Sequence, residues 1–178
     1  MRKMSQNIKR VRMLSNRNKF DEALPFLLDG VKKKDAEATY ALSTWYFYGR
    51  AVKKDFRKSG ILLKKAAILK HPLATFEYAV SLEWGKRARK DLKAALRWYK
   101  RAFELKYTGS AREIARMYYH GIGISKNLKK SFEYTKIAAR KKDKEARLAL
   151  SGMYLRGEGV EKNKRMADLW YKRAHQTR

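Results

Sequence analysis

Apolar, small and polar residues recur along the chain at an interval of 36 residues. One series is glycine: Gly49, Gly85, Gly121 and Gly157. A second is alanine, Ala66, Ala102, Ala138 and Ala174, and a third is Asp or Asn, Asp55, Asp91, Asn127 and Asn163. Self-similarity at such a period is typical of repeat architectures. We therefore predict four repeats, at residues 35–70, 71–106, 107–142 and 143–178.

The pattern within each unit predicts two helices joined by a tight turn. Large apolar residues occupy two positions of the first helix, four residues apart and so on one face: Leu42, Tyr78, Ile114 and Leu150, then Tyr46, Leu82, Tyr118 and Tyr154. The glycine that follows suits a left-handed helix C-cap. The Asp or Asn six residues later suits the N-cap of the second helix, because its side chain can accept a hydrogen bond from a free backbone N–H.

The second helix pairs a large residue with the recurring alanine four residues later. The large residues are Leu62, Trp98, Tyr134 and Trp170. Large beside small is how packed helices interlock. We therefore predict that Trp98 and Trp170 are core residues rather than part of a cofactor site.

Residues 1–34 fit an N-terminal partial repeat or cap. Residues 17–34 match the second half of a unit, and Ile8, Val11 and Leu14 would line one side of a short leading helix. The sequence thus predicts about ten helices in five hairpins, with 35–178 forming one continuous domain.

The repeat unit resembles a known family. The pattern A-x3-L-x3-Y-x2-G, followed by a turn, Asp or Asn, and W-Y-x-[KR]-A, is similar to the Sel-one-like repeat, a relative of the tetratricopeptide repeat. It is clearest in "ARLALSGMYLRGEGVEKNKRMADLWYKRA". The resemblance implies an all-α, right-handed α-solenoid that acts as an adaptor without catalysis, with the first helices lining a concave groove. Small bacterial proteins of this kind include immunity partners of toxins.

Two positions depart from the family pattern. The second turn glycine is present as Gly123 and Gly159 but is replaced by Ala51 and Arg87. The glycine after the second helix is replaced by Lys70, Lys106 and Lys142. These substitutions call the shape of those corners into question.

The charge is strongly positive and unevenly placed. Lys and Arg number 45 against 17 Asp and Glu, a net charge of +28, which attracts acidic protein, nucleic acid or anionic lipid. Of the 35 Lys and Arg in the four repeats, five lie in the predicted first helices: Arg112, Arg116, Lys144, Arg147 and Arg156. On the geometry that the resemblance implies, the cations lie mainly on the outside and rims.

The candidate partner-binding residues are those on the first helices that face away from the core. They are Tyr40, Thr44, Phe47, Tyr48, Phe76, Val80, Glu83, Arg112, Arg116 and Tyr119. Aromatic and arginine side chains dominate binding hot spots. Two interpretations remain open for Tyr40, Phe47 and Phe76, because such residues can contact a partner or pack between neighbouring repeats. The first two windows also hold Glu37, Glu77 and Glu83 without Lys or Arg.

Three kinds of partner fit these features, in a definite order. The leading hypothesis is a scaffold for an acidic or mixed-charge protein, of which a toxin domain bound by an immunity protein is one specific form. The alternative is an RNA-binding helical-repeat protein, because aromatics adjoin cations in "WYKRA". Attachment to a membrane surface comes third, because no basic helix keeps an unclaimed apolar face.

An enzyme, a metal site and a cofactor are not expected. The chain has no cysteine, and His71, His120 and His175 lack a metal-ligand spacing. No catalytic constellation recurs, and "GIGISKN" lacks the ending of a phosphate-binding loop. The N-terminus has no apolar run of a signal peptide and no stretch is long enough to span a membrane, so we expect a cytoplasmic protein.

Overall fold

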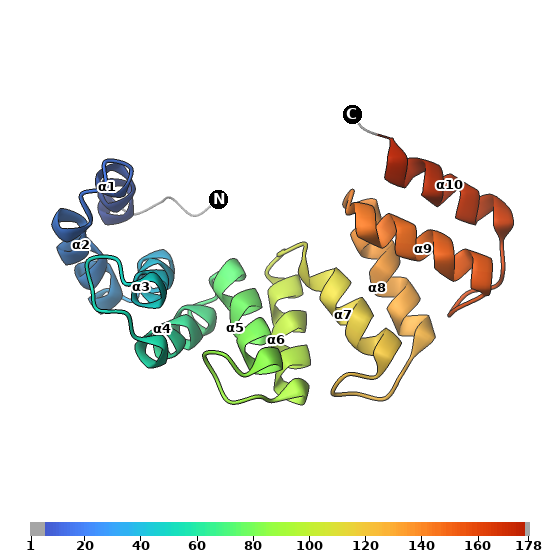
Figure 1. Cartoon of the computed structure of the whole chain (residues 1–178), viewed down its shortest axis with the longest axis horizontal. Coiled ribbons are helices and arrows are strands. Elements are labelled where there is room, and N and C mark those ends of the chain that lie inside the picture. Colours follow the sequence, from blue (N-terminus) through green and yellow to red (C-terminus); the bar gives the residue numbers. More distant parts are fainter. Residues whose placement is uncertain (1–5, 177–178) are drawn as a thin grey trace. The chain divides into compact units, whose positions relative to one another are not determined.

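The chain folds into helices joined by short turns (Figure 1). The computed structural model describes residues 6–176, and within them it has ten helices and no strand. The helices are α1 (Gln6–Ser15), α2 (Phe20–Lys32), α3 (Ala36–Tyr48), α4 (Phe56–Ile68), α5 (Pro72–Trp84), α6 (Leu92–Glu104), α7 (Ser110–His120), α8 (Leu128–Arg140), α9 (Lys144–Arg156) and α10 (Lys164–His175). The predicted all-α class and the two helices in each 36-residue repeat are confirmed.

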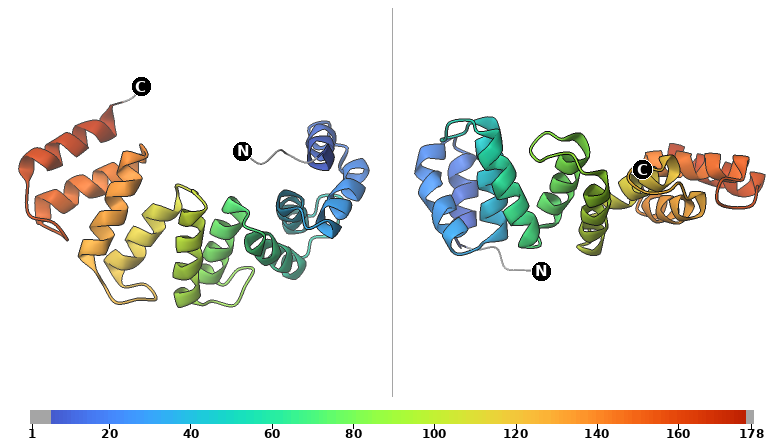
Figure 2. Two further views of the ribbon diagram at one scale, coloured as in Figure 1. Left: turned by 180° about the vertical axis from the view of Figure 1, so that it is seen from behind. Right: turned by 90° about the horizontal axis from the view of Figure 1, so that it is seen from below.

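The chain divides into two compact units, and each is described by itself. Unit 1 is Met1–Lys90 and contains α1 to α5; unit 2 is Asp91–Arg178 and contains α6 to α10. In unit 1, α1 packs on α2, α2 on α3, α3 on α4 and α4 on α5. In unit 2, α6 packs on α7, α7 on α8, α8 on α9 and α9 on α10. The α9 and α10 helices lie side by side in both views of Figure 2.

The turn inside each repeat begins and ends as the sequence indicates. Gly49, Gly85, Gly121 and Gly157 have φ of 74°, 72°, 71° and 73°. In this left-handed conformation, the N–H of each glycine bonds a carbonyl oxygen of the last helical turn. Asp55, Asp91, Asn127 and Asn163 then cap the second helices, each side chain accepting from the backbone N–H three residues on.

The lysines at the corner after the second helices adopt the left-handed backbone conformation that usually favours glycine. Lys70, Lys106 and Lys142 have φ of 63°, 66° and 67°. A side chain in this region costs about 1–2 kcal/mol. Hydrogen bonds at the corner offset part of this cost and position the start of the next repeat. The N–H of the residue after Lys70 donates to the carbonyl of Ala66, and that of the residue after Lys106 donates to the carbonyl of Ala102.

The turn without a second glycine in repeat two is shaped differently. Ala51 adopts φ of 50°, but Arg87 does not have positive φ. Its backbone carbonyl instead lies against Gly60 of α4, where a Cβ would overlap it. The glycines of later turns, Gly123 and Gly159, lie against the first residues of α6 and α8. In unit 1 the glycine that permits close approach therefore belongs to the helix rather than the turn.

The core of each unit uses the predicted positions on the first helices and the alanines of the second. Leu42, Tyr78, Ile114 and Leu150 are buried, and so are Ala66, Ala102, Ala138 and Ala174. At the N-terminus Ile8, Val11 and Leu14 are buried against α2 and α3, which confirms the predicted apolar side of a leading helix. Large and small side chains thus interlock within each unit.

The large position of the second helices is less buried than the sequence suggests. Trp170 is 6% exposed, but Trp98 is only half-buried, with the Arg101 guanidinium 5.1 Å from the centre of its ring. The next residue, Tyr99, is 1% exposed. Each second helix buries a face that spans several residues. In α6 this face is centred on Tyr99 rather than on Trp98. Trp98 therefore lies at the edge of the core, which corrects its placement as a core residue.

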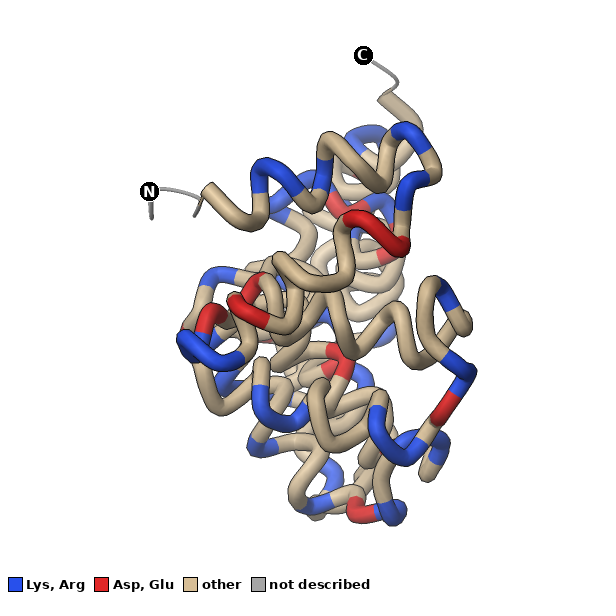
Figure 3. Tube along the Cα trace, turned by 90° about the vertical axis from the view of Figure 1, so that its left-hand side faces the viewer, with Lys and Arg blue, Asp and Glu red and all other residues tan. Residues whose placement is uncertain are grey.

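Basic residues occur along the whole described trace, with fewer acidic ones between them (Figure 3). Within the four repeats they are concentrated on turns and second helices, and α3 and α5 contain no Lys or Arg. In α7 the cations are Arg112 and Arg116. The first helix of repeat three therefore differs in charge from those of repeats one and two.

Candidate functional site

The candidate residues of unit 1 lie on α3 and α5 and differ widely in exposure. Tyr48 is 63% exposed, whereas Glu83 is only 6% exposed. The others are half-buried: Tyr40, Thr44, Phe47, Phe76 and Val80. Glu83 is therefore not a surface group. It belongs to a broad buried face of α5 that also includes Tyr78, Ala79 and Leu82. Tyr48 is the aromatic side chain of this set most available to a partner.

A network of contacts covers part of two of these aromatic side chains, Tyr40 and Phe47. The Tyr40 hydroxyl donates to Glu77 at 2.7 Å, and Arg87 donates to the other oxygen of Glu77 at 3.1 Å. The Arg87 guanidinium also lies over the ring of Phe47, 5.0 Å from its centre. These contacts hold Tyr40 and Phe47 in place, and both side chains remain partly exposed.

A second network joins three helices of unit 1 around Glu37. His71 stacks on Tyr40 with ring centres 4.6 Å apart, accepts the Ala74 N–H at Nδ1, and has Nε2 3.1 Å from Glu37. With Nδ1 accepting, Nε2 carries the hydrogen that is donated to Glu37. The hydrogen bond from His71, followed by that from Arg12, lowers the pKa of Glu37 to about 2 against the opposing effect of burial. The carboxylates Glu37 and Glu77 lie on helices without Lys or Arg, and they are paired with Arg12 and Arg87 from outside α3 and α5.

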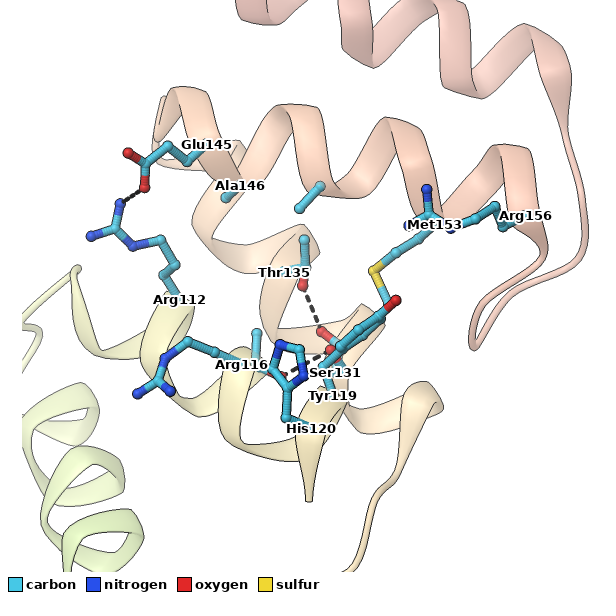
Figure 4. Close-up of a pocket in the computed structure, with 12 residues that line it drawn as sticks. Arg112, Arg116, Tyr119, His120, Ser131, Thr135, Glu145, Ala146, Met153 and Arg156 are labelled. Carbon is cyan, nitrogen blue, oxygen red and sulfur yellow. Dashed lines mark hydrogen bonds and ion pairs between the residues drawn. The ribbon is translucent and has the colours of Figure 1, made fainter. Parts of the chain in front are cut away.

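The candidate residues of unit 2 surround a pocket between α7, α8 and α9. Its volume is about 390 Å³. Figure 4 shows that Arg112, Arg116, Tyr119 and His120 come from α7, and that Met153 of α9 points toward Tyr119. We call this the arginine pocket, lined by Arg112, Ala115, Arg116, Tyr119, His120, Ser131, Thr135, Glu145, Ala146, Ala149, Met153 and Arg156.

Carboxylates of the chain hold the arginines at the mouth of the arginine pocket. Arg112 pairs with Glu145, and its guanidinium lies 3.6 Å from Asp143 and 3.7 Å from Glu113. Arg116 donates to Glu113 at 2.9 Å. Glu113 thus lies between the two arginines, so the paired guanidinium groups that the sequence predicts one helical turn apart do occur together.

A third cation stands at the other end of the pocket. Arg156 donates to Glu158 at 2.8 Å, and the Tyr119 hydroxyl donates to the second oxygen of Glu158 at 3.0 Å. The bond from Arg156, more than that from Tyr119, holds the pKa of Glu158 below its usual value, and the pKa of Arg156 is correspondingly raised. Tyr119 therefore has its hydroxyl engaged and presents its ring to the pocket.

The sequence did not predict that Arg156, Met153 and the small residues of α8 would line one pocket together with Arg112. A signal was present, because Thr135 stands 36 residues from Tyr99 and 72 from Leu63, both large and buried. A small residue at that position leaves space in the stack. Comparing the size of side chains at equivalent positions would have indicated the pocket.

Two negative observations bound the chemistry of the described part of the chain. Residues 6–176 contain no group of three or more His, Cys, Asp or Glu side chains placed to hold a metal ion. None of the ten helices is long and apolar enough to cross a membrane.

The fold and these surfaces define a helical-repeat scaffold of the all-α solenoid class. The sequence matches the Sel1 repeat family over residues 36–71, 72–107, 109–143 and 144–174. These matches cover most of the chain, which therefore belongs to the Sel1 repeat family. Proteins of this family generally act in protein–protein interaction and are typically not enzymes.

Three solved structures are similar to this chain, and two of them are described as a Sel1 repeat protein and a protein with an SLR fold. A Sel1 repeat protein from Oxalobacter formigenes has a TM-score of 0.81 at 27% identity, over 86% of this chain and 63% of its own. A protective antigen with an SLR fold from uropathogenic Escherichia coli strains has a TM-score of 0.81 at 24% identity, over 87% of this chain and 33% of its own. Cysteine rich protein B of Helicobacter pylori has a TM-score of 0.52 at 21% identity, over 67% of this chain and 91% of its own.

The chain thus spans less than two thirds of the first two of these structures, at 63% and 33% of their lengths. No curated protein matches the sequence significantly.

Proposed function

We propose that this protein is a non-catalytic scaffold that binds an acidic or mixed-charge protein through the surfaces of its first helices. The observation that carries the proposal is the arginine pocket, in which Arg112, Arg116 and Arg156 surround a cavity with an apolar floor. The net charge of +28 would speed the encounter with an acidic partner, and the pocket would supply contacts specific to it.

The aromatic surface of unit 1 supports the same proposal. Tyr48 is 63% exposed, and Tyr40 and Phe47 are half-buried. Tyrosine offers a partner a large contact area with few rotatable bonds, which is why it is common in binding hot spots. Tyr48 is thus the unit 1 side chain whose removal would weaken partner binding most.

The proposal is tested by capturing partners from nuclease-treated lysate of the source cells on the immobilised full chain. The bound proteins are identified at low salt and again at about 0.15 M salt. A variant with Arg112→Glu and Arg116→Glu reverses the charge of the pocket and should lose the partner. A variant with Arg57→Glu and Lys64→Glu, both exposed on α4, makes the same change of net charge elsewhere and should keep it. Loss of the partner in both variants would show that only the total charge matters.

One specific form of this proposal is an immunity protein that neutralises an acidic toxin domain. In that case one captured protein would be toxic when expressed alone, and co-expression with this chain would restore growth. The pocket-reversal variant would fail to protect, whereas the α4 variant would protect.

Nucleic acid is the alternative partner, and exposed aromatic side chains near cations favour it. Trp84 is 65% exposed and Tyr171, next to Lys172, is 55% exposed. Such rings can stack on bases. Against this alternative, Trp170 in the "WYKRA" segment is buried. Measuring RNA and DNA affinity against salt separates the two: an affinity that collapses steeply with salt and is lost to competitor indicates charge alone.

A further inference from the structure

The arginine pocket opens where one position of repeat three carries a smaller side chain than its equivalents in repeats one and two. Thr135 stands where Leu63 and Tyr99 fill the stack. Ala149 also lines the pocket, at a position that is Ala41 in repeat one and Glu77 and Glu113 in repeats two and three. The cavity is therefore a local feature of unit 2 and does not follow from the repeat pattern.

The cations at the mouth of the pocket are just as local. Arg112 occupies the position that is Tyr40 in repeat one and Phe76 in repeat two. Arg156 occupies the position that is Tyr48 in repeat one. Aromatic side chains are thus exchanged for arginines at the same place where the cavity opens.

The floor of the pocket is apolar in character. Ala115, Ala146 and Met153 are 5% exposed or less. The two hydroxyls at the base are already engaged, because Ser131 donates to the carbonyl of Ala115 at 2.9 Å and Thr135 to that of Ser131 at 2.8 Å. An entering group finds methyl and thioether surface there rather than unpaired donors, which favours an apolar side chain.

The carboxylates around the pocket differ in how easily a partner could replace them. The side chain of Glu145 is 75% exposed and that of Arg112, its partner, 43% exposed. An exposed ion pair of this kind contributes little to stability and exchanges readily. Glu113 is only 19% exposed and contacts both Arg112 and Arg116, so it fixes the two guanidinium groups in place. A carboxylate from outside would replace Glu145 and leave Glu113 undisturbed.

From this arrangement we infer that the arginine pocket binds an acidic peptide segment of the partner, with one apolar side chain of leucine or methionine size on the pocket floor and carboxylates on either side of it. The flanking carboxylates pair with Arg112 at one end and Arg156 at the other. This inference rests on the proposed function and adds the chemistry of the segment that is recognised.

The test uses two dye-labelled peptides and the full chain. One peptide has a single leucine flanked on both sides by glutamates, and the matched peptide has serine in place of the leucine. Fluorescence anisotropy at about 0.15 M salt measures both affinities. We expect the leucine peptide to bind about tenfold more tightly, because part of one leucine side chain leaves water.

Two variants and a control locate the effect. Thr135→Leu restores the large residue found at Leu63 and should abolish the preference for leucine without changing the affinity of the serine peptide. Arg112→Gln should weaken both peptides about threefold, as expected for loss of a half-exposed ion pair. Arg165→Gln removes one exposed cation from α10 and should change neither affinity beyond the effect of one distant charge. Circular dichroism verifies that each variant is folded.

The outcomes separate this inference from the proposed function. Equal binding of the two peptides, or a preference for leucine that survives Thr135→Leu, overturns the inference while acidic binding stands. If neither peptide binds, an acidic partner is itself contradicted. If Arg165→Gln weakens binding as much as Arg112→Gln, the interaction reports total charge and the pocket has no role.

Discussion

The last turn of the chain offers a matched pair of substitutions that tests how each repeat packs on the one before it. Gly157 and Gly159 both have φ of 73°, so alanine meets the same backbone strain at each. At Gly157 the new Cβ would lie 2.9 Å from Cγ of Lys162, a flexible side chain that can turn away. At Gly159 it would overlap the backbone carbonyl of Leu128, the first residue of α8.

The expected losses in the free energy of unfolding follow from these surroundings. The left-handed conformation costs alanine about 1–2 kcal/mol. Alanine also lowers the conformational entropy of the unfolded chain relative to glycine, which offsets about 0.4–1 kcal/mol of this cost. Gly157→Ala should therefore cost about 1 kcal/mol. Gly159→Ala adds an overlap with backbone, which costs about 1–3 kcal/mol more.

Urea unfolding of the full chain, followed by circular dichroism, measures both variants against wild type. We expect the midpoint to fall clearly further for Gly159→Ala, with little change of slope for either variant. Equal losses for the two glycines would refute the reasoning, since they would show that the turn does not press on α8.

Three further predictions concern other parts of the fold. Lys106→Gly should raise the free energy of unfolding by about 0.5–1 kcal/mol in a urea titration, because it relieves a side chain at φ of 66°. Trp170→Ala should cost about 3–5 kcal/mol in the same assay, and the half-buried Trp98→Ala clearly less. Since the pKa of Glu37 falls to about 2 in the fold, its bond with His71 stabilises the protein above the usual carboxylate pKa and loses this effect as pH falls toward 2. Glu37→Gln should thus be less stable than wild type near pH 7, by at most about 1 kcal/mol because the side chain is 41% exposed, and the gap should close in acid.

The helices and turns could be predicted from the sequence because local chemistry determines them. A glycine with positive φ, such as Gly121, and an N-cap such as Asn127 depend on their nearest neighbours along the chain. Each of these local signals recurs in all four repeats, which supports its assignment. The lysine corners adopt the left-handed conformation typical of glycine, as Lys142 does with φ of 67°.

Burial could be predicted only to within a residue or two. The position of Trp98 is large in every repeat and so looks like core, but the neighbouring Tyr99 is the buried side chain. Glu83 was predicted to face away from the core because of its position along the helix, yet it is 6% exposed. Which side of a helix is covered depends on how the neighbouring helices pack against it, and spacing alone does not record this packing.

The candidate site shows the same limit. Arg112 and Arg116 could be paired from their spacing on one helix. Their common partner Glu113, and the approach of Arg156 and Met153 from α9, depend on how neighbouring repeats stack. Likewise, Arg87 reaches Glu77 and Phe47 only because the turn after α5 folds back on unit 1.

Hydrogen exchange of the full chain, with and without the acidic leucine peptide, tests the central claim most directly. The account predicts slower backbone exchange on binding in Ser110–His120 of α7 and Lys144–Arg156 of α9, with little change in α4 and α10. Protection spread over the basic second helices, without any in α7 and α9, would contradict the assignment of binding to the first helices.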